Sequence, residues 1–171
     1  MIGSGFVALQ AAWAARYRGL DVVVLELMDR IMPSVLDEEG ARLLTEKIRE
    51  KGVDLRTGVS TQRFEKLDDG TFKIHLVGGE EIEADFVIVG TGVRSNIGFL
   101  KDTDIQTERG ILVDSHMRTN IPNIYAAGDV AAGPTTFGDE HLIHALWPTA
   151  CEMGKTAGKN MAGIDFEYEG S

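Results

Sequence analysis

The feature that most constrains this chain is a glycine-rich turn at its third and fifth positions. Gly3-Ser4-Gly5 stands directly before a segment with the spacing of a helix, and Ala8 follows three residues after Gly5. In such a pattern the first glycine permits a tight turn, and the second lets the backbone approach a ligand closely. Ala8 lets the helix pack against a strand. The free amides at the helix start would then face a phosphate. Alone, the turn fits an ordinary loop at the start of a helix as well. Together with the helix, the buried strand and the acid that follow it, the turn predicts a nucleotide-binding α/β fold.

An acidic residue follows at the end of the next apolar run. The run 22–25 (VVVL) is typical of a parallel strand buried on both faces, and Glu26 stands at its carboxyl end. An acid about 20 residues after the glycines accepts hydrogen bonds from the adenosine ribose in dinucleotide-binding folds. Two like charges about 4 Å apart repel by roughly 4 kcal/mol at an effective dielectric near 20, so Glu26 favours NAD over NADP. The alternative is a solvated acid at a strand end.

The spacing of apolar residues predicts helices and strands around a small antiparallel insert. Helices are expected over 6–18, 37–51 and 150–162, the last with Thr149 and Glu152 as a capping box. Leu43, Leu44 and Ile48 are expected on the buried side of the second helix. Strands are expected over 22–25, 53–56, 59–67, 71–77, 81–83, 85–90 (buried and parallel), 111–113 and 124–126.

Composition excludes several classes of partner. The 171 residues are enough for one domain or two small ones, and 43% hydrophobic residues is ordinary for a globular protein. A net charge of −10 argues against nucleic acid, because an acidic surface repels phosphates. No apolar run approaches the roughly 20 residues of a membrane span, which argues against a membrane. The single cysteine and the absence of a visible signal peptide predict a cytoplasmic protein.

Neither a catalytic nucleophile nor a metal site is predicted. Cys151 has no histidine at catalytic spacing and is expected to be a packed small thiol. His141 and His144 are three residues apart, but no further ligand pattern completes a metal site.

Two further motifs follow apolar runs. Gly90-Thr91-Gly92 comes at the end of the expected strand 85–90, where bare backbone could admit a ligand or form an ordinary turn. The segment 123–129 (NIYAAGD) ends in two alanines, Gly128 and Asp129. Its small residues would leave room for a cofactor, and the aspartate could accept hydrogen bonds from sugar hydroxyls. The alternative is a strand followed by a turn.

These motifs, in this order and spacing, resemble the FAD-dependent pyridine nucleotide–disulfide oxidoreductase family. NADH oxidases, coenzyme A-disulfide reductases and rubredoxin or nitrite reductase flavoproteins are similar in pattern. The resemblance implies an α/β fold. Residues 1–96 would be a Rossmann-like, three-layer NAD-binding domain with a small antiparallel β-meander insert. Residues 97–171 would be the C-terminal portion of a second Rossmann-like domain, which binds FAD. The runs 146–150 (LWPTA) and 160–163 (NMAG) extend the resemblance over almost the whole chain.

The resemblance also implies the cofactors, NAD (as NADH) and FAD, and their contacts. The NAD contacts would be Gly3, Gly5, Phe6, Val7, Ala8 and Glu26, with Gly90, Thr91 and Gly92 beside the nicotinamide. The FAD contacts would be Gly128, Asp129, Pro148, Thr149 and Ala150. The helix starting near Thr149 would point its N-terminus at the flavin, where its dipole favours the negative charge of the reduced form.

The implied reaction is hydride transfer from NADH to FAD, followed by electron delivery to oxygen, a disulfide or a small redox protein. The alternative is a nucleotide-binding module with no turnover of its own, which is what we expect of the isolated chain. The family's FAD glycine motif and its redox-active cysteine are not found in these residues, and the resemblance implies that the dimerisation domain would begin after Ser171. Gln10 stands where many relatives have Glu.

The strand that normally precedes Gly3 is reduced to Met1 and Ile2. Its neighbours are therefore expected to have unpaired backbone groups. This predicts a loosened NAD domain, a homo-oligomer, or association with complementary segments.

Overall fold

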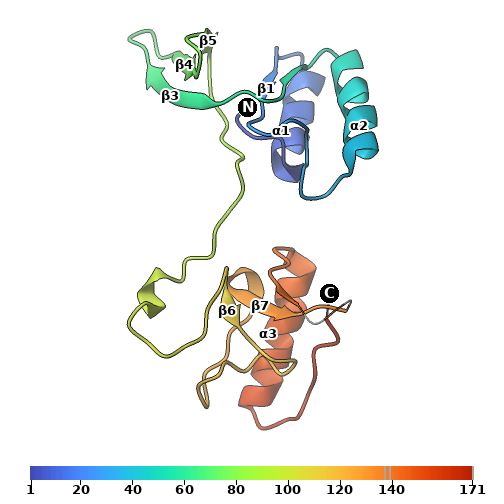
Figure 1. Ribbon diagram of the computed structural model, residues 1–171, viewed down its shortest axis with the longest axis vertical. Helices are drawn as coiled ribbons and strands as arrows, with labels where there is room; N and C mark the ends of the chain where they lie inside the picture. The colour runs from blue at the N-terminus through green and yellow to red at the C-terminus, as the bar shows by residue number, and fades with distance from the viewer. Residues whose placement is uncertain (137, 139, 171) are drawn as a thin grey trace. The chain divides into compact units, whose positions relative to one another are not determined.

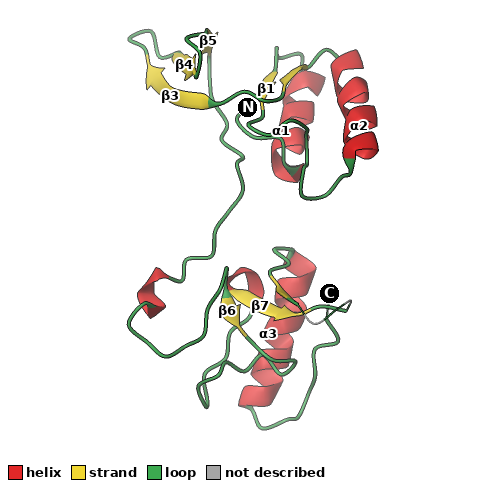
Figure 2. Cartoon of the chain, viewed as in Figure 1, coloured by secondary structure: helices red, strands yellow, loops and turns green. Residues whose placement is uncertain are grey.

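The computed structural model describes residues 1–136, 138 and 140–170. The chain divides into two compact units, Met1–Gly92 and Val93–Ser171. Both units combine short strands with helices, and loops make up much of the second (Figures 1 and 2).

The first unit contains a parallel strand pair covered by two helices. Helix α1 (Phe6–Tyr17) leads to β1 (Val23–Leu25), and α2 (Glu38–Glu50) leads to β2 (Asp54–Arg56). Strands β1 and β2 pair in parallel. One hydrophobic core joins all four elements, with Ala12, Val24, Ala41 and Leu55 among its buried members. The predicted helices and strands of this α/β unit are therefore confirmed to within one or two residues.

The ends of both helices follow from local chemistry. The carboxylate of Asp37 accepts a hydrogen bond from the Gly40 amide at 2.8 Å, so Asp37 is the N-cap of α2. Gly19 ends α1 with a φ of 84°, as a C-terminal cap requires. The predicted burial of Leu43 was wrong. Its side chain is 49% exposed, and the small residue Ala41 takes the buried position instead.

The antiparallel insert is present as predicted. Strands β3 (Thr61–Lys66), β4 (Phe72–Leu76) and β5 (Glu81–Ala84) form a meander in that order. Ile74 and Leu76 of β4 pack with Leu25 in a second buried cluster, which fastens the insert to the end of β1.

The predicted buried strand 85–90 was wrong in its burial and regularity. This segment has one isolated parallel bridge, between Val89 and Ile2. Phe86 is 52% and Val89 is 55% exposed. Ile2 donates to the Ile88 carbonyl at 2.9 Å and also bridges to Leu25, so Met1 and Ile2 lie between β1 and this segment. Apolar side chains are buried only where neighbouring elements cover them. Because this segment pairs through a single bridge, few neighbouring residues cover Phe86 and Val89.

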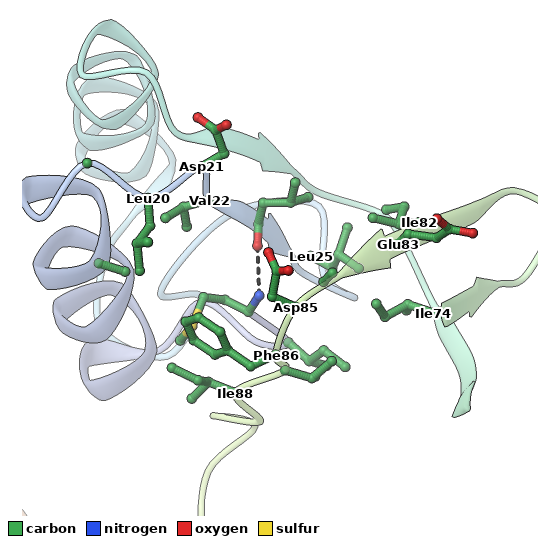
Figure 3. Close-up of a pocket in the computed structure, with 17 residues that line it drawn as sticks. Leu20, Asp21, Val22, Leu25, Ile74, Ile82, Glu83, Asp85, Phe86 and Ile88 are labelled. Carbon is green, nitrogen blue, oxygen red and sulfur yellow. Dashed lines mark hydrogen bonds between the residues drawn. The ribbon is translucent and has the colours of Figure 1, made fainter. Parts of the chain in front are cut away.

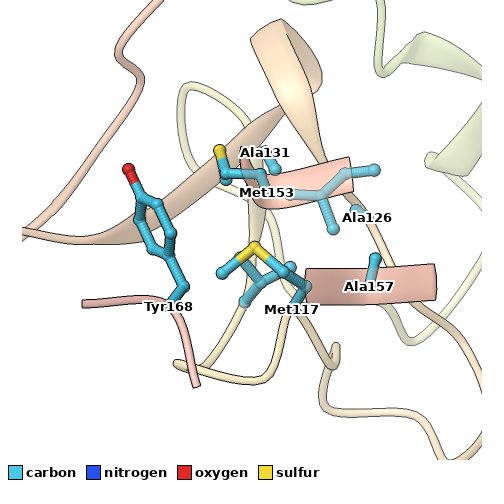
Figure 4. Packing of buried hydrophobic residues seen from close by; sticks show 8 residues of the cluster. Met117, Ala126, Ala131, Met153, Ala157 and Tyr168 are labelled. Atoms are coloured by element: carbon cyan, nitrogen blue, oxygen red, sulfur yellow. The ribbon is translucent and has the colours of Figure 1, made fainter. Parts of the chain in front are cut away.

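The second unit contains a small sheet packed on a long helix. Its elements are η1 (Gly98–Leu100), β6 (Ile111–Leu112), η2 (Gly128–Val130), β7 (Ala131–Pro134), β8 (His141–Leu142) and α3 (Trp147–Met161). Strands β6 and β7 are parallel, and β8 pairs antiparallel to β7. The buried side chains of Met117 and Met153 lie at the centre of the core of this unit, with Tyr168 beside them (Figure 4).

Two predictions for this unit were wrong. Residues 124–126 form no regular strand, because the Arg118–Tyr125 bridge is isolated. Helix α3 begins at Trp147, three residues earlier than predicted, and its N-cap is Leu146 without a side-chain hydrogen bond. Pro148 fits this first turn, since proline has the helical φ and lacks an amide hydrogen that would remain unpaired there. Thr149 is thus a buried residue inside the helix and not the cap of a capping box.

Candidate functional site

The glycine turn has the geometry that its residues predict. Gly3 has a φ of 95°, and a Cβ at this position would lie 2.5 Å from the Gly90 carbonyl oxygen. No heavy atom lies within 4 Å of a Cβ built on Gly5, the N-cap residue of α1. Gly3 is therefore required by the fold, whereas Gly5 leaves open space where α1 presents its first amides. Phe6 and Val7 are 64% and 74% exposed on the same turn.

Ala8 brings α1 close to the segment that ends at Gly90. A Cβ on Gly90 would lie only 2.8 Å from the Ala8 Cβ. Gly90 therefore has a packing role that sequence reasoning did not assign to it. Thr91 and Gly92 follow it on the surface, and Gly92 has a φ of 95° with open space around it. The predicted contact of these three residues with nicotinamide stays a prediction.

Glu26 is joined directly to the glycine turn. Its Oε2 accepts from the Ser4 backbone amide at 2.8 Å and from the Ser4 hydroxyl at 2.5 Å. Its Oε1 accepts from the Met28 amide at 2.8 Å. Glu26 is 8% exposed and Ser4 is 0% exposed. A buried carboxylate with three donors is held in one position, which rules out the alternative of a solvated strand-end acid.

Sequence reasoning found Glu26 but missed its two partners. Ser4 occupies the variable position between the two glycines, and Met28 contributes only a backbone amide. A small hydroxyl residue in that position was the one signal that could have indicated a bond to the acid.

The residues predicted for FAD lie together in the second unit. Gly128 has a φ of 76°, and a Cβ there would lie 3.5 Å from the Ala150 Cβ, so η2 passes close to the first turn of α3. Pro148 and Thr149 belong to the same turn of α3. The Asp129 side chain is exposed, while its backbone carbonyl accepts from the Ser95 hydroxyl at 2.7 Å. Half-buried Cys151 also lies in α3.

A cavity of about 440 Å³ lies away from the glycine turn. It is bordered by the C-terminal end of α1, the start of β1 and the segment 84–88 (Figure 3). The Met1 ammonium donates to the Val23 carbonyl at 2.7 Å beside it, and burial lowers the pKa of this amine below its usual value. Phosphate-binding turns stand at the carboxyl ends of parallel strands, so this cavity is at the wrong end of β1 for a coenzyme phosphate.

Comparison with known proteins identifies the family. The family model for pyridine nucleotide-disulphide oxidoreductases matches residues 1–154, which is most of the chain. The chain belongs to this family. Its members use FAD and NAD(H), and the predicted family, fold class and pair of cofactors are thereby confirmed.

Two curated relatives illustrate the similarity. The ferredoxin–NAD(+) reductase component of the p-cumate 2,3-dioxygenase system of Pseudomonas putida is 34% identical over 99% of this chain and 40% of its own length. An NADH oxidase of Methanocaldococcus jannaschii is 32% identical over 98% of this chain and 37% of its own length. The chain therefore spans about two fifths of the length of these relatives.

Solved structures give the same result. A water-forming NADH oxidase from Lactobacillus brevis bound to NADH superposes with a TM-score of 0.88 at 29% identity, over 98% of this chain and 37% of that one. A NAD-dependent persulfide reductase from A. fulgidus gives a TM-score of 0.89 at 32% identity, over 99% of this chain and 31% of that one.

Among the described residues, none of the helices has the length and apolar character that a membrane span needs.

Proposed function

We propose that residues 1–96 bind NADH, with its diphosphate at the turn formed by Gly3, Gly5, Phe6, Val7 and Ala8. The observation that carries this proposal is the buried carboxylate of Glu26 bonded to Ser4 inside that turn. A carboxylate beside the first amides of α1 is a group that could accept from the adenosine ribose while those amides bind the diphosphate. The negative charge of the same carboxylate disfavours a 2′-phosphate, so NADH is preferred to NADPH.

We further propose that residues 97–171 contribute to an FAD site and that the whole protein is an NADH-dependent flavoprotein oxidoreductase. Gly128, Asp129, Pro148, Thr149 and Ala150 would contact the cofactor, which accepts a hydride from NADH and passes electrons on. The close approach of η2 to the first turn of α3 supports this proposal. Thr91 is exposed and a Cβ on Gly92 would meet no heavy atom within 4 Å, which suits the nicotinamide end of NADH.

The electron acceptor and the assembly also belong to this proposal. One structural neighbour is a covalent putidaredoxin reductase–putidaredoxin complex, so a small redox protein is an acceptor class to test, beside oxygen and disulfides. We propose a cytoplasmic location, and association with further copies or with complementary segments, as the arrangement to examine first.

A substitution at Gly5 tests coenzyme binding without disturbing the fold. Gly5→Val builds a branched side chain on a Cβ position that has no heavy atom within 4 Å, and it would block a phosphate there. We expect fluorescence titration with NADH to show at least tenfold weaker binding than the unsubstituted chain, whereas loss of the glycine N-cap of α1 lowers the free energy of unfolding by only about 1 kcal/mol. Gly154→Val is the matched control, because Gly154 also has open space and lies on α3. Equal NADH affinity in all three proteins would refute the proposed turn.

A second experiment separates the oxidoreductase from a module without turnover. The chain is incubated with FAD and then with NADH, and the flavin absorbance is followed under argon. Bleaching that depends on the protein supports hydride transfer. Saturable NADH binding without bleaching supports the module.

A further inference from the structure

The Glu26 carboxylate has almost no acceptor capacity left for a ligand. An ionised carboxylate has two oxygens with about four acceptor positions in all. Ser4 fills both positions of Oε2, with its amide at 2.8 Å and its hydroxyl at 2.5 Å. The Met28 amide fills one position of Oε1 at 2.8 Å. A single acceptor position therefore remains, on Oε1.

An adenosine ribose offers two hydroxyl donors, whereas the Glu26 carboxylate has one acceptor position left. A carboxylate that accepted both hydroxyls would need a free position on each oxygen. The amide of Ser4 is fixed by the turn, because Gly3 and α1 hold the backbone on either side. The hydroxyl of Ser4 is therefore the donor that decides whether Oε2 can accept a second ribose hydroxyl.

The surroundings of Ser4 keep its hydroxyl on Glu26. Ser4 is 0% exposed, and within the described residues its hydroxyl has no other hydrogen-bond partner than Glu26. Turning the hydroxyl away would leave a buried polar group unpaired, which is costly. A hydrogen bond to an ionised acceptor is also stronger than one between neutral groups.

We propose that Ser4 is a specificity-determining residue, whose hydroxyl occupies one acceptor position of Glu26 so that the carboxylate accepts one of the two adenosine ribose hydroxyls. This inference rests on the proposed binding of NADH at the glycine turn. One ribose hydroxyl then contributes to affinity through Glu26 and the other does not.

Coenzyme analogues test the inference without any substitution. The dissociation constants of NADH and of two analogues, one lacking the 2′-hydroxyl and one lacking the 3′-hydroxyl of the adenosine ribose, are measured by fluorescence titration. For the unsubstituted chain we expect one deletion to weaken binding about tenfold, as for a lost hydrogen bond to a charged group, and the other to change it less than twofold. Equal losses of fivefold or more, or no loss from either deletion, would overturn the inference.

The substitution Ser4→Ala then assigns the asymmetry to the hydroxyl. It keeps the backbone amide on Oε2 and frees the second position, so both deletions should now weaken binding at least fivefold. An unchanged asymmetry in a folded Ser4→Ala protein would contradict the role of the hydroxyl. Ser60→Ala is the matched control in the same unit, and it should reproduce the unsubstituted pattern. Absence of saturable NADH binding would refute the proposed function together with this inference, whereas tight binding with equal losses would refute the inference alone.

Discussion

The contact between Ala8 and Gly90 gives the sharpest test of how the glycine turn is held in place. In Gly90→Ala the new methyl group would lie 2.8 Å from the Ala8 Cβ and 3.3 Å from its Cα, whereas carbon atoms prefer about 3.5–4.0 Å. Overpacking costs about 1–3 kcal/mol, and the loss of glycine freedom in the unfolded chain returns about 0.5 kcal/mol. We expect a net destabilisation of about 1.5 kcal/mol.

The reverse change removes the methyl group from the helix. Ala8 is 1% exposed, so Ala8→Gly loses about 0.8 kcal/mol of burial and about 1 kcal/mol of helix propensity. If the two substitutions were independent, their sum would be about 3.3 kcal/mol. In the double variant one methyl group replaces the other in the same space, so we expect a cost of only about 1 kcal/mol.

Urea unfolding measures this coupling. Trp13 lies in α1, and Trp147→Phe removes the only other tryptophan, so fluorescence then follows the first unit. The predicted difference between the double variant and the sum of the single variants is about 2 kcal/mol. Additivity within about 0.5 kcal/mol, as for independent sites, would show that these two residues do not share one space.

Three further predictions concern caps, buried amides and coenzyme choice. Asp37→Ala removes the N-cap hydrogen bond of α2 and should lower the free energy of unfolding by about 1 kcal/mol in urea titrations. An unchanged free energy of unfolding would show that Asp37 does not stabilise the helix. Asn160→Ala removes the amide that donates to the Phe166 carbonyl at 2.7 Å. The substitution should lower the free energy of unfolding by about 3 kcal/mol, measured by thermal unfolding against Asn96→Ala at an exposed position. Glu26→Ser with Leu27→Arg should shift the ratio of NADPH to NADH affinity at least tenfold toward NADPH, and a constant ratio would contradict the charge argument.

The sequence specified the first unit well because its strongest signals are local. Glycines with positive φ, an aspartate N-cap and a β-branched run each act over a few residues, so α1, α2 and β1 appear close to their predicted bounds. Burial of a residue depends on its neighbours in space, which explains the errors there. Leu43 belongs to an apolar stripe, yet the small Ala41 is what fits between α2 and the strands.

The second unit was harder to predict because its elements are short and their pairing is distant in sequence. Strand β8 has two residues and pairs with β7 through the register Gly133–Leu142. Two residues have no detectable period, so only the three-dimensional neighbour defines such a strand. The start of α3 was misplaced for a different reason. Thr149 and Glu152 have the sequence of a capping box, but Pro148 continues the helix toward Trp147, and the threonine is buried instead.

The candidate site shows the same division between local signals and spatial ones. Spacing along the chain was enough to place Glu26 at the carboxyl end of a strand next to the glycine turn. The number of hydrogen bonds that this carboxylate can still accept depends on Ser4 and Met28, which reach it only after folding. A motif therefore predicts which coenzyme fragment a residue meets, but the buried donors around that residue determine how many bonds it forms. For this chain the group that we propose as determining is a serine hydroxyl between two glycines, at the position that the motif leaves undefined.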